Sequence, residues 1–330
     1  MTSIDQQHRK MPLRTVFNCW KGACFLAVFG LPALGLAEQG SDDTEVSVVS
    51  EISVDRIALE LSNPVTLLRS VAIDVEYRTY QGSLPEAGEQ DAYRTVFTPS
   101  WPIKLSNGKS LLMRATIPVY GGQPYWKPVW YLDYAEFLIR QLPYIDETAE
   151  GFSDGHGHLG AVGFDIGYGG VSENGFISMV GIANAMPTSD DQSARRGQWL
   201  IGPELALGQI TKWGLYGFRA KHLTNIDGTG EQEVDYDTNE TTLELFFAYA
   251  LGNGWQIESN PVILYDWEAV SDNEWNVPVG LGVSKTMMLG KMPMKFGLEL
   301  QKFVVSTDRF GPDWQINLNL TPLISTRLME

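Results

Sequence analysis

The sequence predicts an all-β protein: a closed antiparallel transmembrane β-barrel of about twelve strands, with short periplasmic turns and long extracellular loops. Three observations support this prediction. Apolar and polar residues alternate over long segments, short and long connections alternate along the chain, and the chain begins with an export leader. The composition agrees, because charged residues make up only 19% of the chain, whereas a soluble domain averages about 25%.

The N-terminal segment indicates where the protein is located. A basic stretch ends at Lys21, an apolar segment runs from Ala23 to Leu36, and Ala37 supplies the small residue at a cleavage site. This pattern is typical of a secretory signal peptide over residues 1–37. The apolar segment is too short for a spanning helix, which needs about 20 residues. We therefore expect an exported protein of the bacterial outer membrane, in a Gram-negative envelope.

Cleavage would also limit the chemistry of the mature chain. Cys19 and Cys24 both leave with the leader, so no disulfide, thiolate metal site or cysteine nucleophile is expected. The whole chain has a net charge of −16, and the leader removes further basic residues. Nucleic-acid binding is disfavoured, because it requires a basic face that neutralises phosphates. No cofactor is expected.

The chain divides into four expected parts. These are the signal peptide over 1–37, a periplasmic N-terminal segment over 38–68, the barrel over 69–324 and a C-terminal tail over 325–330. In the second part, Ser53 to Leu61 has the pattern of a capped short helix. That helix would either plug the periplasmic mouth of the barrel or form part of a plain tether.

The alternation is clearest near the C-terminus. Trp314, Ile316, Leu318 and Leu320 alternate with polar residues, which gives one apolar and one polar face. A strand produces this period of two and a helix does not. The predicted strands are also long, which suits a membrane barrel with about 9–11 residues per crossing better than a soluble sheet with about 5–6.

Twelve strands follow from this pattern. They are predicted at 69–81, 91–105, 109–120, 158–171, 175–187, 196–209, 213–225, 240–252, 254–267, 274–288, 292–306 and 312–324. Short and long connections alternate between them, as in outer-membrane barrels, which would place both termini in the periplasm. Asn107-Gly108 predicts a two-residue hairpin turn. Tryptophans near strand ends fit aromatic girdles: Trp101, Trp199, Trp213, Trp255, Trp267, Trp275 and Trp314.

Several short motifs carry a family resemblance. They are Asn63-Pro64-Val65, Arg114 to Val119, Pro187-Thr188, Trp199 to Pro203, Trp275 to Gly280, Leu289-Gly290-Lys291 and Gly311 to Trp314. With these motifs, residues 57–324 resemble bacterial outer-membrane barrels labelled "transporter" or "neuromedin U", related to the barrel group named for the MetA pathway of phenol degradation. The resemblance implies a barrel and hints at aromatic cargo, but it brings no catalytic residues. The chain departs from the pattern at Gly155 to Leu159 and beyond its last strand, where it continues to Glu330.

If the apolar faces contact lipid, the opposite faces line the lumen. The candidate lumen and constriction residues carry charges of both signs: Asp74, Glu76, Arg78, Arg94, Arg114, Asp165, Glu204, Arg219, Lys221, Glu244, Glu258, Lys295 and Glu299. Two interpretations stay open. The charges form either a salt-bridge network that only makes a narrow barrel rigid, or a hydrated constriction that filters solutes by charge.

The connection 121–157 is the longest and is rich in aromatic residues. Long loops in barrels are often functional, and this loop could fold inward and partly occlude the lumen. The candidate gating residues are Tyr125, Trp126, Trp130, Tyr131 and Tyr134. A surface cap is the alternative.

The favoured function is a channel or porin-like transporter for small solutes of unknown identity. One alternative is an enzyme resembling a lipid hydrolase, but His156, His158 and His222 of the mature chain have no serine-elbow motif near them. Another is a non-conducting structural or adhesive barrel. No metal site is predicted, because the spacing of the acidic loop clusters does not match a calcium-binding loop. The expected partners are the lipid bilayer, lipopolysaccharide and the barrel-assembly machinery.

Overall fold

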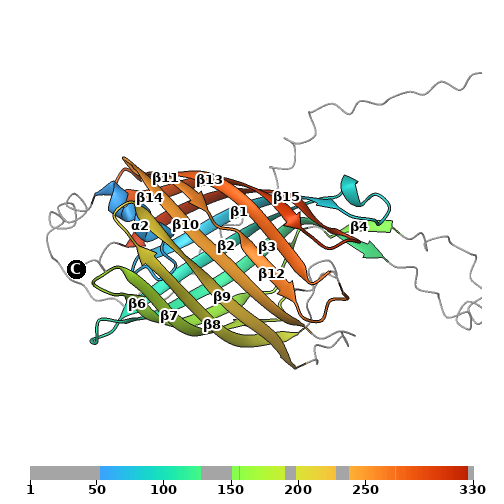
Figure 1. Ribbon diagram of the computed structural model, residues 1–330, viewed down its shortest axis with the longest axis horizontal. Coiled ribbons are helices and arrows are strands. Elements are labelled where there is room, and N and C mark those ends of the chain that lie inside the picture. Colours follow the sequence, from blue (N-terminus) through green and yellow to red (C-terminus); the bar gives the residue numbers. More distant parts are fainter. Residues whose placement is uncertain are drawn as a thin grey trace, which may run out of the picture. The chain divides into compact units, whose positions relative to one another are not determined.

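The computed structural model describes residues 53–127, 151–155, 157–189, 198–227, 238–271 and 273–325, and they form a closed β-barrel (Figure 1). The predicted signal peptide lies outside the described residues. The strands are β1 (Arg69–Gln81), β2 (Asp91–Lys104), β3 (Ser110–Lys127), β4 (Gly151–Gly155), β5 (His158–Leu159), β6 (Gly163–Val171), β7 (Phe176–Ala185), β8 (Trp199–Ile210), β9 (Gly214–Asp227), β10 (Asn239–Gly252), β11 (Trp255–Ser259), β12 (Val262–Asp266), β13 (Trp275–Leu289), β14 (Met292–Val305) and β15 (Gly311–Ser325). The helices are α2 (Val54–Ser62) and the short 3₁₀ helix η2 (Ala87–Glu89).

Each strand pairs antiparallel with its neighbours, and the sheet closes where β1 pairs with β15. β11 and β12 are two halves of one barrel strand, because both pair with β10 and both pair with β13. The break falls at Asn260-Pro261, where a proline has no N–H to donate to the ladder. β5 and β6 likewise follow one another along β3. The predicted closed barrel of twelve strands is confirmed.

The prediction of a loop over 121–157 is wrong at both ends of that range, where the structure has strands. β3 continues to Lys127, and its outer part pairs with β4, from Gln123 opposite Gly155 to Lys127 opposite Gly151. Gly121, Gly122 and Pro124 suggest a loop in the sequence. Pairing with β4 overrides those local breakers, because it satisfies the backbone groups of the extended segment.

The connections alternate in length as predicted, which defines two ends of the barrel. We call the end with the connections 105–109, 172–175, 211–213, 253–254 and 290–291 the turn end, and the opposite end the loop end. At 105–109, Gly108 has a φ of +76° but Asn107 has no positive φ. The two-residue turn predicted there is therefore replaced by a longer turn with glycine in the left-handed position.

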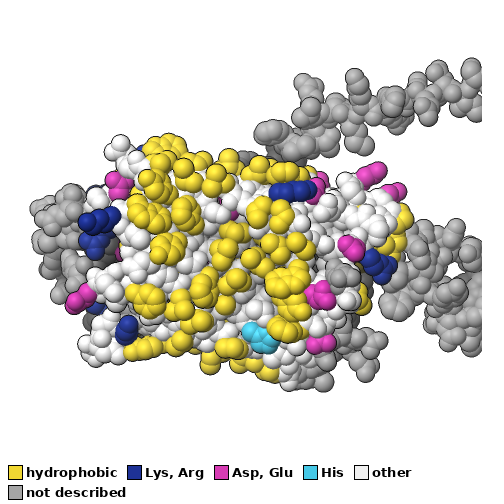
Figure 2. Space-filling view, in the orientation of Figure 1, with side chains coloured by type: hydrophobic (Ala, Val, Ile, Leu, Met, Phe, Trp, Pro, Cys, Tyr) yellow, Lys and Arg dark blue, Asp and Glu magenta, His cyan; other side chains and the backbone are white. Residues whose placement is uncertain are grey.

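The outer surface of the barrel is apolar, and Figure 2 shows hydrophobic side chains spread over its wall. Val180, Ile182, Leu281 and Leu298 lie in mid-strand and are between 48% and 62% exposed. The seven tryptophans predicted to lie near strand ends are also exposed. Trp101, Trp213 and Trp255 are near the turn end and the other four near the loop end, as in the aromatic girdles of membrane barrels. No helix among the described residues is long and apolar enough to cross a membrane.

Helix α2 packs against the inner wall of the barrel at the turn end (Figure 1). It begins where Ser53 caps it, with Ser53 Oγ accepting from the backbone N–H of Arg56 at 3.2 Å. The backbone N–H of Gly254 donates to Asp55 Oδ1 at 2.5 Å, which ties the helix to the turn between β10 and β11. The short helix predicted from Ser53 to Leu61 is therefore present, and its contacts exceed those of a plain tether.

An apolar cluster fills the lumen beside α2. Val65, which follows the helix, packs with inward-facing residues of five strands: Leu112, Ile177, Met179, Ala206, Leu215, Phe246 and Ala248. The ring of Phe246 lies against Gly208 and Gly217, and a Cβ at Gly217 would come within 2.4 Å of Phe246 Cζ. Alternation alone did not predict this cluster, because it assigns the inward face to polar residues.

Candidate functional site

The predicted lumen residues lie on the inner face of the barrel, and ten of the thirteen form ion pairs in three layers. The lowest layer is at the turn end, where Lys295 Nζ of β14 lies 2.5 Å from Glu258 Oε1 of β11. Ser62, the last residue of α2, joins this pair: its hydroxyl donates to Glu258 at 3.0 Å and accepts from Lys295 at 2.9 Å. This layer therefore connects the N-terminal helix to the barrel wall.

The middle layer is an ion-pair network across five strands. Arg114 of β3 lies 3.6 Å from Asp165 of β6 and 3.2 Å from Glu204 of β8. Arg219 of β9 lies 3.4 Å from the same Glu204 and 2.6 Å from Glu244 of β10. The Glu204 side chain is fully buried at the centre of the network. Each arginine thus has two carboxylate partners, which compensates its burial.

Small side chains make the middle network possible. β7 lies between β6 and β8, and its inward residues at this height are Gly181 and Ala183. Neither side chain extends far into the space between Asp165 and Glu204, the two carboxylates that Arg114 contacts. Lys221 lies opposite Glu204 in the β8–β9 register, on the same inner face.

Asp74 and Glu299 are held by neutral partners. Asp74 Oδ1 accepts from Asn319 Nδ2 at 2.7 Å. Glu299 accepts from the backbone N–H of Asn260 at 2.9 Å and from Gln301 Nε2 at 2.9 Å. Sequence alternation places Asn319 and Gln301 on the polar faces of their strands but does not reveal which carboxylate each contacts.

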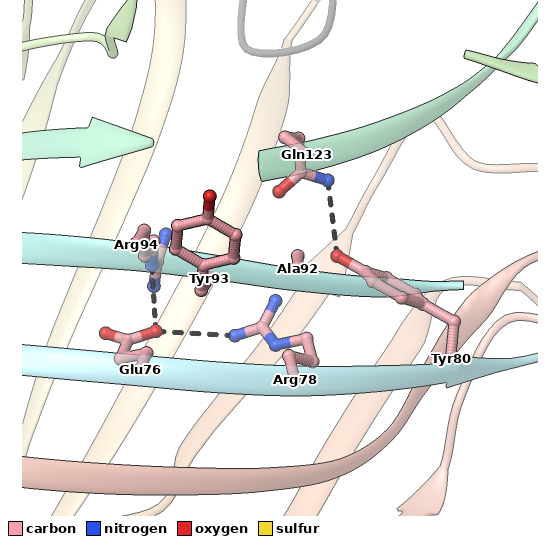
Figure 3. Close-up of a pocket in the computed structure, with 7 residues that line it drawn as sticks. All are labelled: Glu76, Arg78, Tyr80, Ala92, Tyr93, Arg94 and Gln123. Carbon is pink, nitrogen blue, oxygen red and sulfur yellow. Dashed lines mark hydrogen bonds and ion pairs between the residues drawn. The ribbon is translucent and has the colours of Figure 1, made fainter. Parts of the chain in front are cut away.

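The upper layer lies toward the loop end and surrounds a cavity of about 20 Å³ (Figure 3). Arg94 Nε of β2 donates to Glu76 Oε2 of β1 at 2.8 Å, and Arg78 Nη2 lies 3.8 Å from the same oxygen. The cavity is also lined by Tyr80, Ala92, Tyr93 and Gln123. Figure 3 shows Gln123 of β3 above the two arginines, where its amide donates to the Tyr80 hydroxyl at 3.2 Å.

Only part of the predicted gating loop falls on described residues. Tyr125 and Trp126 lie in the outer part of β3 instead of a loop, while Trp130, Tyr131 and Tyr134 lie outside the described residues. The ring of Trp126 meets Phe152 edge-on at 5.1 Å, and Phe152 packs on Phe310 at 4.6 Å. Phe310 stacks on Tyr80 at 4.4 Å, so a row of rings connects the β3–β4 hairpin to the upper layer.

The histidines considered for catalysis lie in different surroundings. His158 is buried and stacks on Tyr120 at 5.2 Å. His222 lies on β9, where Nδ1 is 2.9 Å from the hydroxyl of Thr241. His156 lies outside the described residues. The part of the chain that the structure describes contains no group of three or more His, Cys, Asp or Glu residues placed to hold a metal ion.

Comparison with solved structures supports the fold. An outer membrane channel from Pseudomonas putida F1 is similar with a TM-score of 0.54 at 9% identity, over 80% of this chain and 98% of that chain. The NanC porin gives a TM-score of 0.43 at 10% identity, over 77% and 99% of the two chains. A FadL homologue from Pseudomonas aeruginosa gives 0.39 at 10% identity, over 80% and 92%. No family model and no curated protein matches the sequence.

The fold and its surfaces define the class of protein. A closed antiparallel barrel with an apolar outer wall and a charged interior is the architecture of an outer-membrane transmembrane barrel. The likeness to the Pseudomonas putida channel, at 9% identity, extends to this fold.

Proposed function

We propose that the chain is an outer-membrane channel for small solutes, with the charged lumen as its path. The supporting observation is that ion-paired side chains inside the barrel keep access to solvent: Arg94, Glu244 and Arg78 are 33%, 29% and 28% exposed. An interior needed only for rigidity could be filled with apolar side chains, often without loss of stability. A hydrated lining with both signs of charge instead selects solutes by charge and orientation.

The strand number fits a narrow path. Eight-stranded barrels are filled by side chains, while barrels of about 16–18 strands leave an aqueous channel. A barrel of twelve strands lies between them. We therefore expect a low conductance compared with a general porin.

The N-terminal helix is the proposed closure of this path. α2 and Val65 pack with the apolar cluster below the middle layer, and we propose that a solute crosses when this segment shifts. Partial occlusion by Trp130, Tyr131 and Tyr134 is a further proposal that concerns residues outside the described part. The resemblance of the sequence to the phenol-pathway barrels suggests aromatic solutes as one cargo class.

The test is electrical recording from the refolded mature chain in a planar bilayer. We expect small, discrete conductance steps. The variant Asp55→Ala removes the tie between α2 and Gly254 and should raise the fraction of time spent open. Arg56→Ala is the matched control, because Arg56 is on the exposed side of the same helix.

A folded chain that is silent both as wild type and as Asp55→Ala would overturn the channel proposal. It would favour a structural barrel whose lumen is permanently filled. Folding is checked separately by the shift in gel mobility that intact barrels show before heating.

A further inference from the structure

The upper layer of the lumen has more positive than negative charge. Arg78 and Arg94 lie on neighbouring strands and share a single carboxylate, Glu76, through contacts of 3.8 Å and 2.8 Å. Across the described part of the chain, Glu76 is the one carboxylate within ion-pairing distance of either guanidinium. One positive charge is therefore left without a partner of opposite sign.

The other partners of these arginines are neutral. Arg78 Nε and Nη2 donate to Gln315 Oε1 at 2.7 Å and 2.5 Å. Arg94 Nη1 donates to the Tyr120 hydroxyl at 3.4 Å. Among the described residues, Arg78 Nη1 and Arg94 Nη2 take part in no hydrogen bond. Each guanidinium thus keeps a donor group for a solute.

The middle layer gives the contrast. Arg114 and Arg219 each have two carboxylate partners, and their side chains are only 18% and 12% exposed. The arginines of the upper layer share one carboxylate partner, Glu76, and their side chains are 28% and 33% exposed. An anion that enters the lumen can therefore approach the upper arginines, whereas the middle ones are already neutralised.

The cavity beside Arg78 and Arg94 limits what fits. Its volume of about 20 Å³ is close to the space needed for one water molecule. It can receive a small polar group and not a whole solute, whose remainder must lie in the lumen. Tyr80 and Gln123 line the same cavity and offer further polar contacts (Figure 3).

We propose that Arg78 and Arg94 form a binding site for the carboxylate group of a small monovalent solute. The inference rests on the proposed channel function and names the solute class. One negative charge balances the surplus of the layer, and planar guanidinium groups match the geometry of a carboxylate. The uncharged amide of the same solute lacks this charge and should bind far more weakly.

The experiment measures binding to the full mature chain refolded in detergent. Trifluoroacetate is titrated and followed by broadening of its ¹⁹F resonance, with trifluoroacetamide as the neutral probe. We expect trifluoroacetate to bind and trifluoroacetamide not to bind. The double variant Arg78→Gln with Arg94→Gln should weaken trifluoroacetate binding by about tenfold or more, since it removes charge-assisted hydrogen bonds.

The matched control is Lys212→Gln with Arg309→Gln. It removes two positive charges from exposed residues in connections at opposite ends of the barrel and should leave binding unchanged. If the glutamine variant does not refold, the double variant Arg78→Lys with Arg94→Lys is used instead, because it keeps two positive charges beside Glu76. That variant should weaken binding several-fold, because lysine lacks the planar fork.

Equal binding of trifluoroacetate by the wild type and a folded upper-layer variant would overturn the proposal, as would equal binding of the two probes. The two proposals fail separately. Conductance without carboxylate binding would reject the site and keep the channel. Carboxylate binding by a chain that never conducts would keep the site and reject the channel.

Discussion

Arg114 and Glu204 lie 3.2 Å apart although the strands that carry them, β3 and β8, are separated by β6 and β7. Such a contact is possible only across the inside of the barrel. It links two parts of the wall that are distant in sequence, and it holds the fully buried Glu204 carboxylate between two arginines. The middle layer is therefore structural as well as a lining of the proposed path.

Removal of one arginine from the middle layer should be costly. We expect Arg114→Ala to lower the free energy of unfolding by about 3–5 kcal/mol, because it leaves buried carboxylates short of a partner. Denaturant unfolding followed by tryptophan fluorescence measures the change. Glu173→Gln, on an exposed turn residue, is the control and should change stability by less than about 0.5 kcal/mol. A loss of similar size in both variants would contradict the buried network.

A charge on the outer wall should destabilise according to its depth in the membrane. Leu281 is 62% exposed in the middle of β13, and Leu289 is 46% exposed at its end. Arginine at the bilayer midplane costs about 2–4 kcal/mol, and near the interface about 0–1 kcal/mol. We therefore expect Leu281→Arg to be much more destabilising than Leu289→Arg in unfolding from lipid bilayers. Equal effects would mean that this face does not contact lipid.

The apolar cluster beside α2 should behave as a core. Phe246 is 3% exposed and packs within the cluster, whereas Phe296 is 39% exposed on the outer wall. Truncation of a buried phenylalanine costs about 3–5 kcal/mol, so Phe246→Ala should unfold at clearly lower denaturant concentration than Phe296→Ala. The same variant should also ease the passage of ions in bilayer recordings, since it opens space below the middle layer. If Phe246→Ala is as stable as the wild type, the lower lumen is not packed.

The turn at 105–109 depends on one glycine. Gly108 has a φ of +76°, and its site has open space around it. Gly108→Ala should therefore lose about 1 kcal/mol from backbone strain alone. Gly88 is the matched control, because it also has open space but no positive φ. Equal stability of the two alanine variants would argue against the left-handed turn.

Alternation in the sequence predicts the strands well because lipid outside and a polar lumen inside impose a period of two. The bounds of β1 match the prediction, and β14 differs from it by a single residue. The division at Asn260-Pro261 was missed, since alternation on its two sides reads as one strand. The extension of β3 was missed because Gly121, Gly122 and Pro124 are local breakers whose pairing partner, β4, is distant in sequence.

The sequence predicts which residues face the lumen, but it does not predict which of these residues contact one another. Alternation assigns Arg78, Arg94 and Glu76 to the lumen, but their uneven pairing depends on strand register and on Gln315 from the last strand. Phe246 is at an inward-facing position of β10, as Glu244 is. Its surroundings are nevertheless apolar, because the segment around α2 and glycines of neighbouring strands enclose it. Such contacts arise from the closed barrel and leave no local pattern.

The length of β3 has a consequence for the cell surface. β3 has 18 residues and β1 has 13. At about 3.4 Å per residue, the five additional residues make β3 about 17 Å longer along its strand direction than β1. If the loop end faces outward, as the alternating connection lengths predict, the paired outer ends of β3 and β4 would project beyond the lipid. Antibodies or phages that probe intact cells would meet this hairpin before they reach the barrel rim.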